Sequence, residues 1–367
     1  MVKDYQFFDI NASGPGIMKT VFDNQVAYCT ASGATVTARI VAALSDLMER
    51  GEDGAFLQRA RNWSGPPMAD ALPLRMAGGI HALRLKGAEP RLEAIYIDQA
   101  GADDAAIVAA AIRKHEAELL PWLDGPPQTN EAGRSANFIA AMLWLADRGL
   151  PPRFQCLEIG SSAGINLMLA RNHYDLAGVK VGPVPGAMQF TPEWEGNPPP
   201  AHAIEIVSTK GCDVAPVDLT DPAQALRLRA YIWPEHAVRF ARMDAAIAEA
   251  TKSPPDLVRM NAADFVEAEL AKPQEAGATR ALMHSIVWQY VPADQQVRVT
   301  AAMEAAGAHA TAERPLAWIA LEANRTMHLH ELIVRHWPNA AENPAGDPQL
   351  LARAHPHGAK IEWFANK

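Results

Sequence analysis

The chain has 367 residues, of which 49% are hydrophobic and 20% charged, and its formal net charge is −9 at pH 7. This length allows two domains with sizeable cores, and the negative charge argues against a broad nucleic-acid-binding surface. No apolar run reaches the roughly 20 residues that span a bilayer, so we expect no membrane segment. The three widely spaced cysteines, Cys29, Cys156 and Cys212, indicate a cytoplasmic protein with neither a disulfide framework nor a zinc site.

The first part of the chain is predicted to form a helical domain over residues 18–150. Residues 1–17 are polar and unpatterned, so we expect a flexible tail, and they lack the charged and apolar regions of a signal peptide. Within the helical domain, the Gly78-Gly79 pair weakens the prediction of a continuous helix. Residues 92–97 favour a short strand.

A polar segment over residues 128–134, with the sequence QTNEAGR, precedes a predicted helix over residues 135–148. Asn130, Glu131 and Arg134 arrive just before the next predicted strand, so they could fold over a ligand as part of a lid or substrate site. The alternative is that they cap the helix and bind solvent. The sequence leaves both interpretations open.

The most informative stretch covers residues 153–171 and reads RFQCLEIGSSAGINLMLAR. It predicts a buried strand over residues 154–159, a turn of small residues, and a helix over residues 165–171. Glycines in such a turn allow unusual dihedral angles and a close approach of the backbone to a ligand. The cofactor-binding candidates in this stretch are Glu158, Gly160, Ser161, Ser162, Gly164 and Asn166.

Three interpretations of the turn compete. The pattern Glu158-x-Gly160-x-x-x-Gly164 resembles the first motif of class I S-adenosylmethionine-dependent methyltransferases. Gly160 to Gly164 also satisfies G-x-S-x-G, which would make Ser162 the nucleophile of a serine hydrolase with His355 or His357 as its base. A turn without any cofactor is the third. The dinucleotide and Walker patterns both fail here, and the mostly helical region upstream favours the first interpretation over a hydrolase.

Two acidic loops follow. A Gly/Pro-rich segment near residues 176–202 is predicted to be an insertion with a hairpin and a loop. After the next strand, Asp213 is the candidate for binding the ribose of a nucleotide, although it could simply shape a turn. Beyond a third strand over residues 257–260, Asp264 and Phe265 could bind an adenine by hydrogen bonding and stacking, or Asp264 could cap the following helix.

The fourth predicted strand covers residues 280–287 and carries His284 near its carboxyl end. Histidine side chains can change protonation near neutral pH, so His284 could act as a catalytic base, and Tyr290 is a second catalytic candidate. A histidine in an apolar strand could equally be structural. A fifth strand is predicted over residues 316–321.

The C-terminal region is predicted to contain a short helix over residues 348–354 and a strand over residues 360–364. Two His-x-His pairs, at 328/330 and 355/357, raise the question of a metal site. Neither pair belongs to a complete ligand set, so we expect no metal.

Several segments together resemble an uncharacterised bacterial family, domain of unknown function 2332. The matching segments are QTNEAGR, CLEIGSSAGINL, KGCDVAPVDLTDP, LRAYIWPEH, MHSIVWQYVP, LAWIALE and HPHGAKIEW. This resemblance implies no chemistry. The resemblance of the glycine motif to class I methyltransferases implies a Rossmann-like α/β domain over residues 151–367, with a mainly parallel sheet of about seven strands and helices on both faces.

The methyltransferase resemblance also implies a cofactor, S-adenosylmethionine. Its methionine part would lie near Glu158, Gly160 and Gly164, its ribose at Asp213 and its adenine at Asp264. The expected function is methyl transfer to an unidentified small molecule. The alternatives are the serine hydrolase and a non-catalytic protein that senses a ligand or binds a partner.

Overall fold

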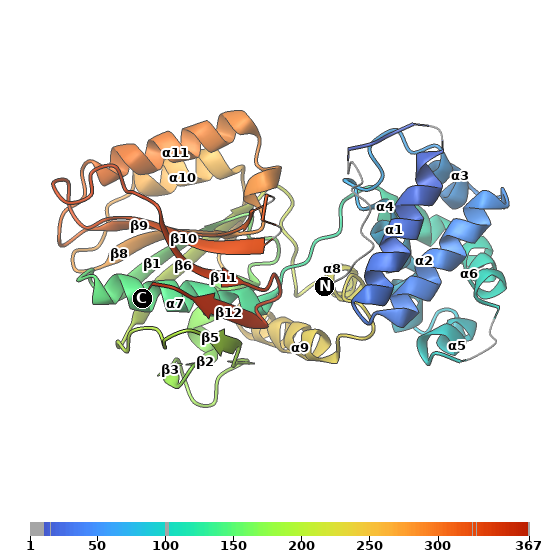
Figure 1. Ribbon diagram of the computed structural model, residues 1–367, viewed down its shortest axis with the longest axis horizontal. Helices are drawn as coiled ribbons and strands as arrows, with labels where there is room; N and C mark the ends of the chain where they lie inside the picture. The colour runs from blue at the N-terminus through green and yellow to red at the C-terminus, as the bar shows by residue number, and fades with distance from the viewer. Residues whose placement is uncertain (1–10, 15, 100–102, 325, 328, 366–367) are drawn as a thin grey trace. The chain divides into compact units, whose positions relative to one another are not determined.

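The computed structural model describes residues 11–14, 16–99, 103–324, 326–327 and 329–365. The chain divides into two compact units (Figure 1). Unit 1 comprises the described residues of Met1–Thr129 together with Asp221–Ala241, and unit 2 comprises those of Asn130–Thr220 and Arg242–Lys367. The first division falls within the QTNEAGR segment, between Thr129 and Asn130. Most of the expected tail lies outside the described residues.

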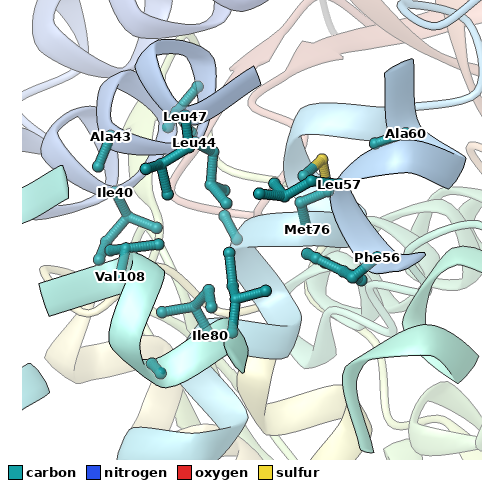
Figure 2. Close-up of a cluster of buried hydrophobic side chains, with 14 of the residues drawn as sticks. Ile40, Ala43, Leu44, Leu47, Phe56, Leu57, Ala60, Met76, Ile80 and Val108 are labelled. Atoms are coloured by element: carbon teal, nitrogen blue, oxygen red, sulfur yellow. The ribbon is translucent and has the colours of Figure 1, made fainter. Parts of the chain in front are cut away.

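The regular secondary structure in the described part of unit 1 is entirely helical. Its elements are α1 (Ile17–Ala31), α2 (Thr35–Glu49), α3 (Ala55–Arg61), α4 (Leu72–Leu85), η1 (Pro90–Leu92), α5 (Glu93–Tyr96), α6 (Asp104–Leu119), η2 (Leu120–Leu123), α8 (Pro222–Ala230) and the start of α9 (Ala237–Lys252). Figure 2 shows part of its core, where Ile40 and Leu44 of α2 lie near Ile80 of α4 and Val108 of α6. The spacing of four residues places Ile40 and Leu44 on one face of α2, which is the face that the core buries.

Two predictions in unit 1 are wrong. Residues 92–97 form helical turns and not a strand, because Leu92 and Ile95 both enter the helical core. Helix α4 also continues through Gly78 and Gly79. A Cβ atom at Gly78 would lie 2.6 Å from the ring of Tyr231, so the glycine allows a close approach that a larger residue would block.

Unit 2 is built on a mixed sheet in the order β5-β12-β11-β10-β9-β8-β1-β6-β7. Its strands are β1 (Arg153–Ile159), β5 (Glu193–Glu195), β6 (Glu205–Asp213), β7 (Leu257–Arg259), β8 (Thr279–Ser285), β9 (Leu316–Asn324), β10 (Leu329–Trp337), β11 (Gln349–Ala354) and β12 (Lys360–Trp363). The five strands from β7 to β9 are parallel. β10 pairs antiparallel with β9 and β11, β11 pairs antiparallel with β12, and β12 pairs parallel with β5. The sheet is thus α/β, but it has nine described strands in place of about seven.

Helices cover both faces of the parallel part of this sheet. In Figure 1, α7 (Ser135–Asp147) lies on one face, and α10 (Ala262–Leu270) and α11 (Ala293–Gly307) lie on the other. This arrangement buries β8 at every position. Parallel strands with long apolar runs require this two-sided cover.

A hairpin of β2 (His173–Leu176) and β3 (Val179–Val181) begins just before the predicted insertion, and β4 (Gln189–Phe190), inside it, pairs with β2. Residues 348–354 form strand β11, so the predicted helix there is wrong. Their pairing with β10 on one side and β12 on the other overrides any local helical preference. Among the described residues, no helix combines the length and the apolarity that crossing a membrane requires.

Candidate functional site

The strand order identifies one edge of the sheet as the place for a ligand. From β1, the chain places β6 and then β7 on one side, and β8 and then β9 on the other. The connections therefore change direction beside β1. In open α/β sheets, ligands bind beyond the carboxyl ends of the strands at such a switch point. The residues that follow β1, β6, β8 and β9 are the candidates.

The glycine turn leaves β1 with three residues in left-handed conformation. Gly160, Ser162 and Gly164 have φ values of 65°, 53° and 70°. A Cβ atom at Gly160 would lie 2.2 Å from Cγ2 of Val287, so both the dihedral angle and the packing require glycine here. The turn is closed by a 2.7 Å hydrogen bond from Gly164 N to Ser161 O. The predicted helix that follows is the 3₁₀ helix η4 (Ile165–Arg171).

Glu158 is the buried acid of the site, with 1% of its surface exposed. Asn166 Nδ2 donates to its Oε1 at 3.0 Å, whereas Oε2 has no hydrogen-bond partner among the described residues. Burial raises the pKa of Glu158 to about 7, even though the bond from Asn166 lowers it. Oε2 of this buried carboxylate therefore lacks the hydrogen-bond donor that buried polar atoms normally have.

Two further oxygen atoms of the same motif also lack a partner within the described part of the chain. They are the hydroxyl of Ser162 and Oδ1 of Asn166. The Ser161 hydroxyl is instead used locally, donating to the carbonyl of Glu158 at 2.9 Å. The unpaired atoms are therefore two acceptors, Oε2 of Glu158 and Oδ1 of Asn166, and one hydroxyl that can donate or accept.

Asp213 ends β6 beside the glycine turn. Its carboxylate accepts hydrogen bonds from the backbone N–H groups of Ser162 and Ala215, each at 2.8 Å. These bonds fix the conformation of the turn, as the turn-shaping interpretation expects. Asp213 also lies on the strand next to β1, where the ribose interpretation requires it. Its contact with a ribose stays a prediction.

The polar segment before α7 lies against the same turn. Asn130 Oδ1 accepts from Ile165 N at 2.8 Å. Arg134 donates to the carbonyls of Pro356 at 2.8 Å and Ser285 at 3.3 Å. Glu131 accepts from the N–H of Gly133 at the start of η3 (Ala132–Arg134), so it also caps this short helix. All three predicted residues are buried in unit 2.

The loop after β7, with Asp264 and Phe265, differs from expectation. Phe265 is 1% exposed and packs into the core under α10 and α11, so its ring is not available to stack on an adenine. Asn261, and not Asp264, caps α10, because its side chain accepts from the N–H of Asp264 at 2.9 Å. The carboxylate of Asp264 pairs with Arg298 at 2.7 Å on α11.

His284 is fixed from both sides of its ring. Trp318 Nε1 donates to Nε2 at 2.9 Å, and Nδ1 lies 2.7 Å from Oε1 of Glu322. Both ring nitrogens are engaged, and the catalytic role of His284 stays a prediction. Tyr290 is 71% exposed at the carboxyl edge, and its catalytic role stays a prediction.

Sequence reasoning did not select Glu322 as a site residue. The sequence feature that could have identified it is the one that selected Glu158 and Asp213, namely an acid at the carboxyl end of a predicted strand. Glu322 Oε1 accepts from the N–H groups of Val287 and Trp288 as well as facing His284. Burial raises the pKa of Glu322, but the bond from His284 and the two backbone donors outweigh it and leave that pKa below its ordinary value.

The hydrolase interpretation lacks its catalytic pair. In the described part of the chain, the hydroxyl of Ser162 makes no hydrogen bond to a histidine. His355 and His357 contact each other, and Nδ1 of His357 lies 3.9 Å from Glu131. Among the described residues, no group of three His, Cys, Asp or Glu side chains could hold a metal ion.

Comparison with known proteins adds the family. The family described as an uncharacterized protein conserved in bacteria (DUF2332) matches residues 19–363. The chain belongs to this family. No curated protein and no solved structure matched the chain.

Proposed function

We propose that unit 2 is an S-adenosylmethionine-dependent methyltransferase that acts on a small molecule. The proposal places the cofactor beyond the carboxyl ends of β1 and β6, next to the glycine turn. The order of the five parallel strands supports this position, because their switch point lies at β1. The three buried, unpaired cysteine thiols are compatible with a reducing cytoplasm as the place of action.

One observation carries the proposal: the unpaired oxygen atoms in the motif that begins with Glu158. Oε2 of Glu158, Asn166 Oδ1 and the Ser162 hydroxyl all lack partners among the described residues. The amino group of a methionine moiety carries a positive charge and three N–H donors. Each of these unpaired oxygens can accept a hydrogen bond from such a donor. Binding such a group would favour the ionised form of Glu158 and lower its pKa from about 7.

The residues of the chain would bind and orient in this reaction. When bound, the cofactor would supply an activated methyl group on a cationic sulfur. Arg134 and Asn130 fix the polar segment against the glycine turn through their bonds to Pro356, Ser285 and Ile165. Alignment of the reacting atoms and exclusion of water are then the main contributions of the protein.

Calorimetric titration of the full-length chain with S-adenosylhomocysteine tests the proposal. We expect binding to the wild type and at least a tenfold weaker binding to Glu158→Gln, which keeps the shape but removes the charge. Glu275→Gln is the matched control, because Glu275 pairs with Arg153 at the opposite end of β1. Absence of binding to the wild type at millimolar ligand would reject the proposal. Binding without methyl transfer to any acceptor would favour ligand sensing.

A further inference from the structure

We propose that Glu322 binds a cationic amino group of the methyl acceptor, and that the acceptor is an amine with an apolar body. This inference rests on the proposed function for the reaction that follows binding. It assigns a specificity role to a residue that lies outside the cofactor motif.

The carboxylate of Glu322 is held through one oxygen only. Its Oε1 accepts from Val287 N at 3.1 Å and from Trp288 N at 3.2 Å, and lies 2.7 Å from Nδ1 of His284. Its Oε2 has no hydrogen bond to any other described residue, and one fifth of the side chain is exposed. Glu322 therefore presents a fixed acceptor toward solvent.

The hydrogen bonds also define the protonation of His284. The indole N–H of Trp318 can only donate, so Nε2 of His284 must accept, and the ring proton lies on Nδ1. That proton points to Glu322 and completes three donors on one oxygen. The ring of His284 stacks on Trp288 with 5.1 Å between centroids, which restricts its rotation. A carboxylate ordered in this way can bind a cation with little further loss of side-chain freedom.

Val287 connects Glu322 to the glycine turn. Its N–H donates to Glu322, and its side chain lies directly against Gly160. The free oxygen of Glu322 thus belongs to the same edge of the sheet as the proposed cofactor position. Val287 would therefore separate a group bound to this oxygen from the glycine turn that follows β1.

The charges near Glu322 favour a cation. No lysine or arginine pairs with it among the described residues, and its carboxylate contacts His284 through a hydrogen bond. Glu331 lies directly opposite it on β10, and like charges in such a pair are unfavourable. Within the described ranges, Glu322 and Glu331 belong to no group of three side chains that could hold a metal ion. An organic cation therefore fits these two carboxylates better than a metal ion.

Exposed apolar side chains follow the strands that end at this edge. They follow four of the five parallel strands, β6, β7, β8 and β9, and comprise Val214, Met260, Tyr290 and Met327. Small-molecule sites combine mostly apolar walls with a few oriented polar groups. A ligand with an amino group at Glu322 and an apolar body along this edge would match both the oriented polar group and the apolar walls of such a site.

The test uses the full-length chain and three amines, each paired with the alcohol of the same body. The pairs are hexylamine with hexanol, phenethylamine with 2-phenylethanol, and tryptamine with tryptophol. We expect at least one amine to bind ten times more tightly than its alcohol in calorimetric titrations, with and without S-adenosylhomocysteine. The backbone amide resonances of Val287 and Trp288 should shift with the amine and not with the alcohol.

Glu322→Gln should remove the preference for the amine. The Gln oxygen can still accept the three native donors, while a neutral NH₂ group replaces Oε2. Glu362→Gln removes the same charge on β12, with β10 and β11 between it and β9, and should leave the preference unchanged within threefold.

The outcomes separate this inference from the proposed function. Equal binding of each amine and its alcohol, or a preference that survives in Glu322→Gln, overturns the amine site even if S-adenosylhomocysteine binds. A Glu322-dependent preference without binding of S-adenosylhomocysteine supports the amine site and rejects the methyltransferase. If Glu322→Gln does not fold, the wild type decides whether the amine site exists. The site then requires tighter binding of an amine than of its alcohol and shifts of the Val287 and Trp288 resonances with the amine alone.

Discussion

The two halves of the large sheet in unit 2 differ in how their strands are buried. β8, in the parallel half, is buried at all seven positions. β10, in the antiparallel half, is buried only at Leu332, Val334 and Trp337. Parallel strands need helices on both faces and end at a common edge, whereas antiparallel strands alternate in direction. The candidate site residues therefore collect at the carboxyl edge of the parallel half.

The halves also differ in the polar atoms that they leave unpaired among the described residues. Around the glycine turn these are acceptors, such as Oε2 of Glu158 and Oδ1 of Asn166. In the antiparallel half they include donors, Nε of Arg353 and Nε1 of Trp363. A cationic ligand would satisfy the first group and not the second. This contrast is why both proposals place a cation at the parallel half.

Gly160→Val should have the largest effect on stability. The new side chain would meet Val287 and require a left-handed conformation, which together should lower the free energy of unfolding by about 4 kcal/mol. Gly149→Val is the control, because Gly149 also has a positive φ but nothing lies within 4 Å of its Cβ position. Urea unfolding of both variants measures the difference. Equal losses would show that the contact with Val287 has no energetic importance.

Leucine truncation should reproduce the contrast in burial. Leu282→Ala on β8 removes a side chain that is 1% exposed, and we expect a loss of about 3 kcal/mol. Leu350→Ala on β11 removes one that is 42% exposed, and the loss should be below about 1 kcal/mol. Urea denaturation midpoints of the two variants compare them. A larger loss at Leu350 would contradict the two-sided cover of the parallel half.

The charge state of Glu158 should make stability depend on pH. Burial raises its pKa from 4.5 to about 7, so the folded state keeps a proton that the unfolded state loses. This contribution to stability is complete below about pH 4.5 and is lost as the pH rises to about 7, by at most about 3 kcal/mol. The advantage of Glu158→Gln over the wild type in melting temperature should therefore be greater at pH 8 than at pH 5. The same difference at both pH values would mean that Glu158 titrates normally.

The smallest expected effect is at the His284 contact. His284→Phe keeps a ring between Trp288 and Trp318 but removes the donor to Glu322 and the acceptor for Trp318. We expect a loss of about 2 kcal/mol in urea unfolding. The pKa of Glu322 should also rise toward its ordinary value, because one cause of its depression is removed. An NMR titration of the Glu322 carboxyl carbon would detect this, and an unchanged pKa would count against the contact.

The parallel half was the more predictable one. Apolar runs bounded by glycine or polar loops correctly indicated the strands β1, β7, β8 and β9. β10 was not predicted, because its polar and apolar residues mix and only its pairing with β9 and β11 defines it. The helix predicted over residues 348–354 failed for the same reason. Strand formation in the antiparallel half depends on neighbours that a local pattern does not contain.

The site residues divide in a similar way. Local spacing correctly placed Glu158 before a turn that only glycine can make at position 160. It could not tell that Phe265 enters the core, since an aromatic residue suits both a loop and a helix face. It also could not show that His284 has both ring nitrogens engaged.

The sequence by itself determined the family, the glycine turn and the order of apolar strands around it, because each depends on residues close together in the chain. The tertiary structure alone decided which polar atoms are satisfied. Arg134 and Pro356, 222 residues apart, share a hydrogen bond, and Glu322 meets a histidine 38 residues away. Such contacts form only when packing brings distant elements together, and burial then fixes which oxygen atoms remain without a donor.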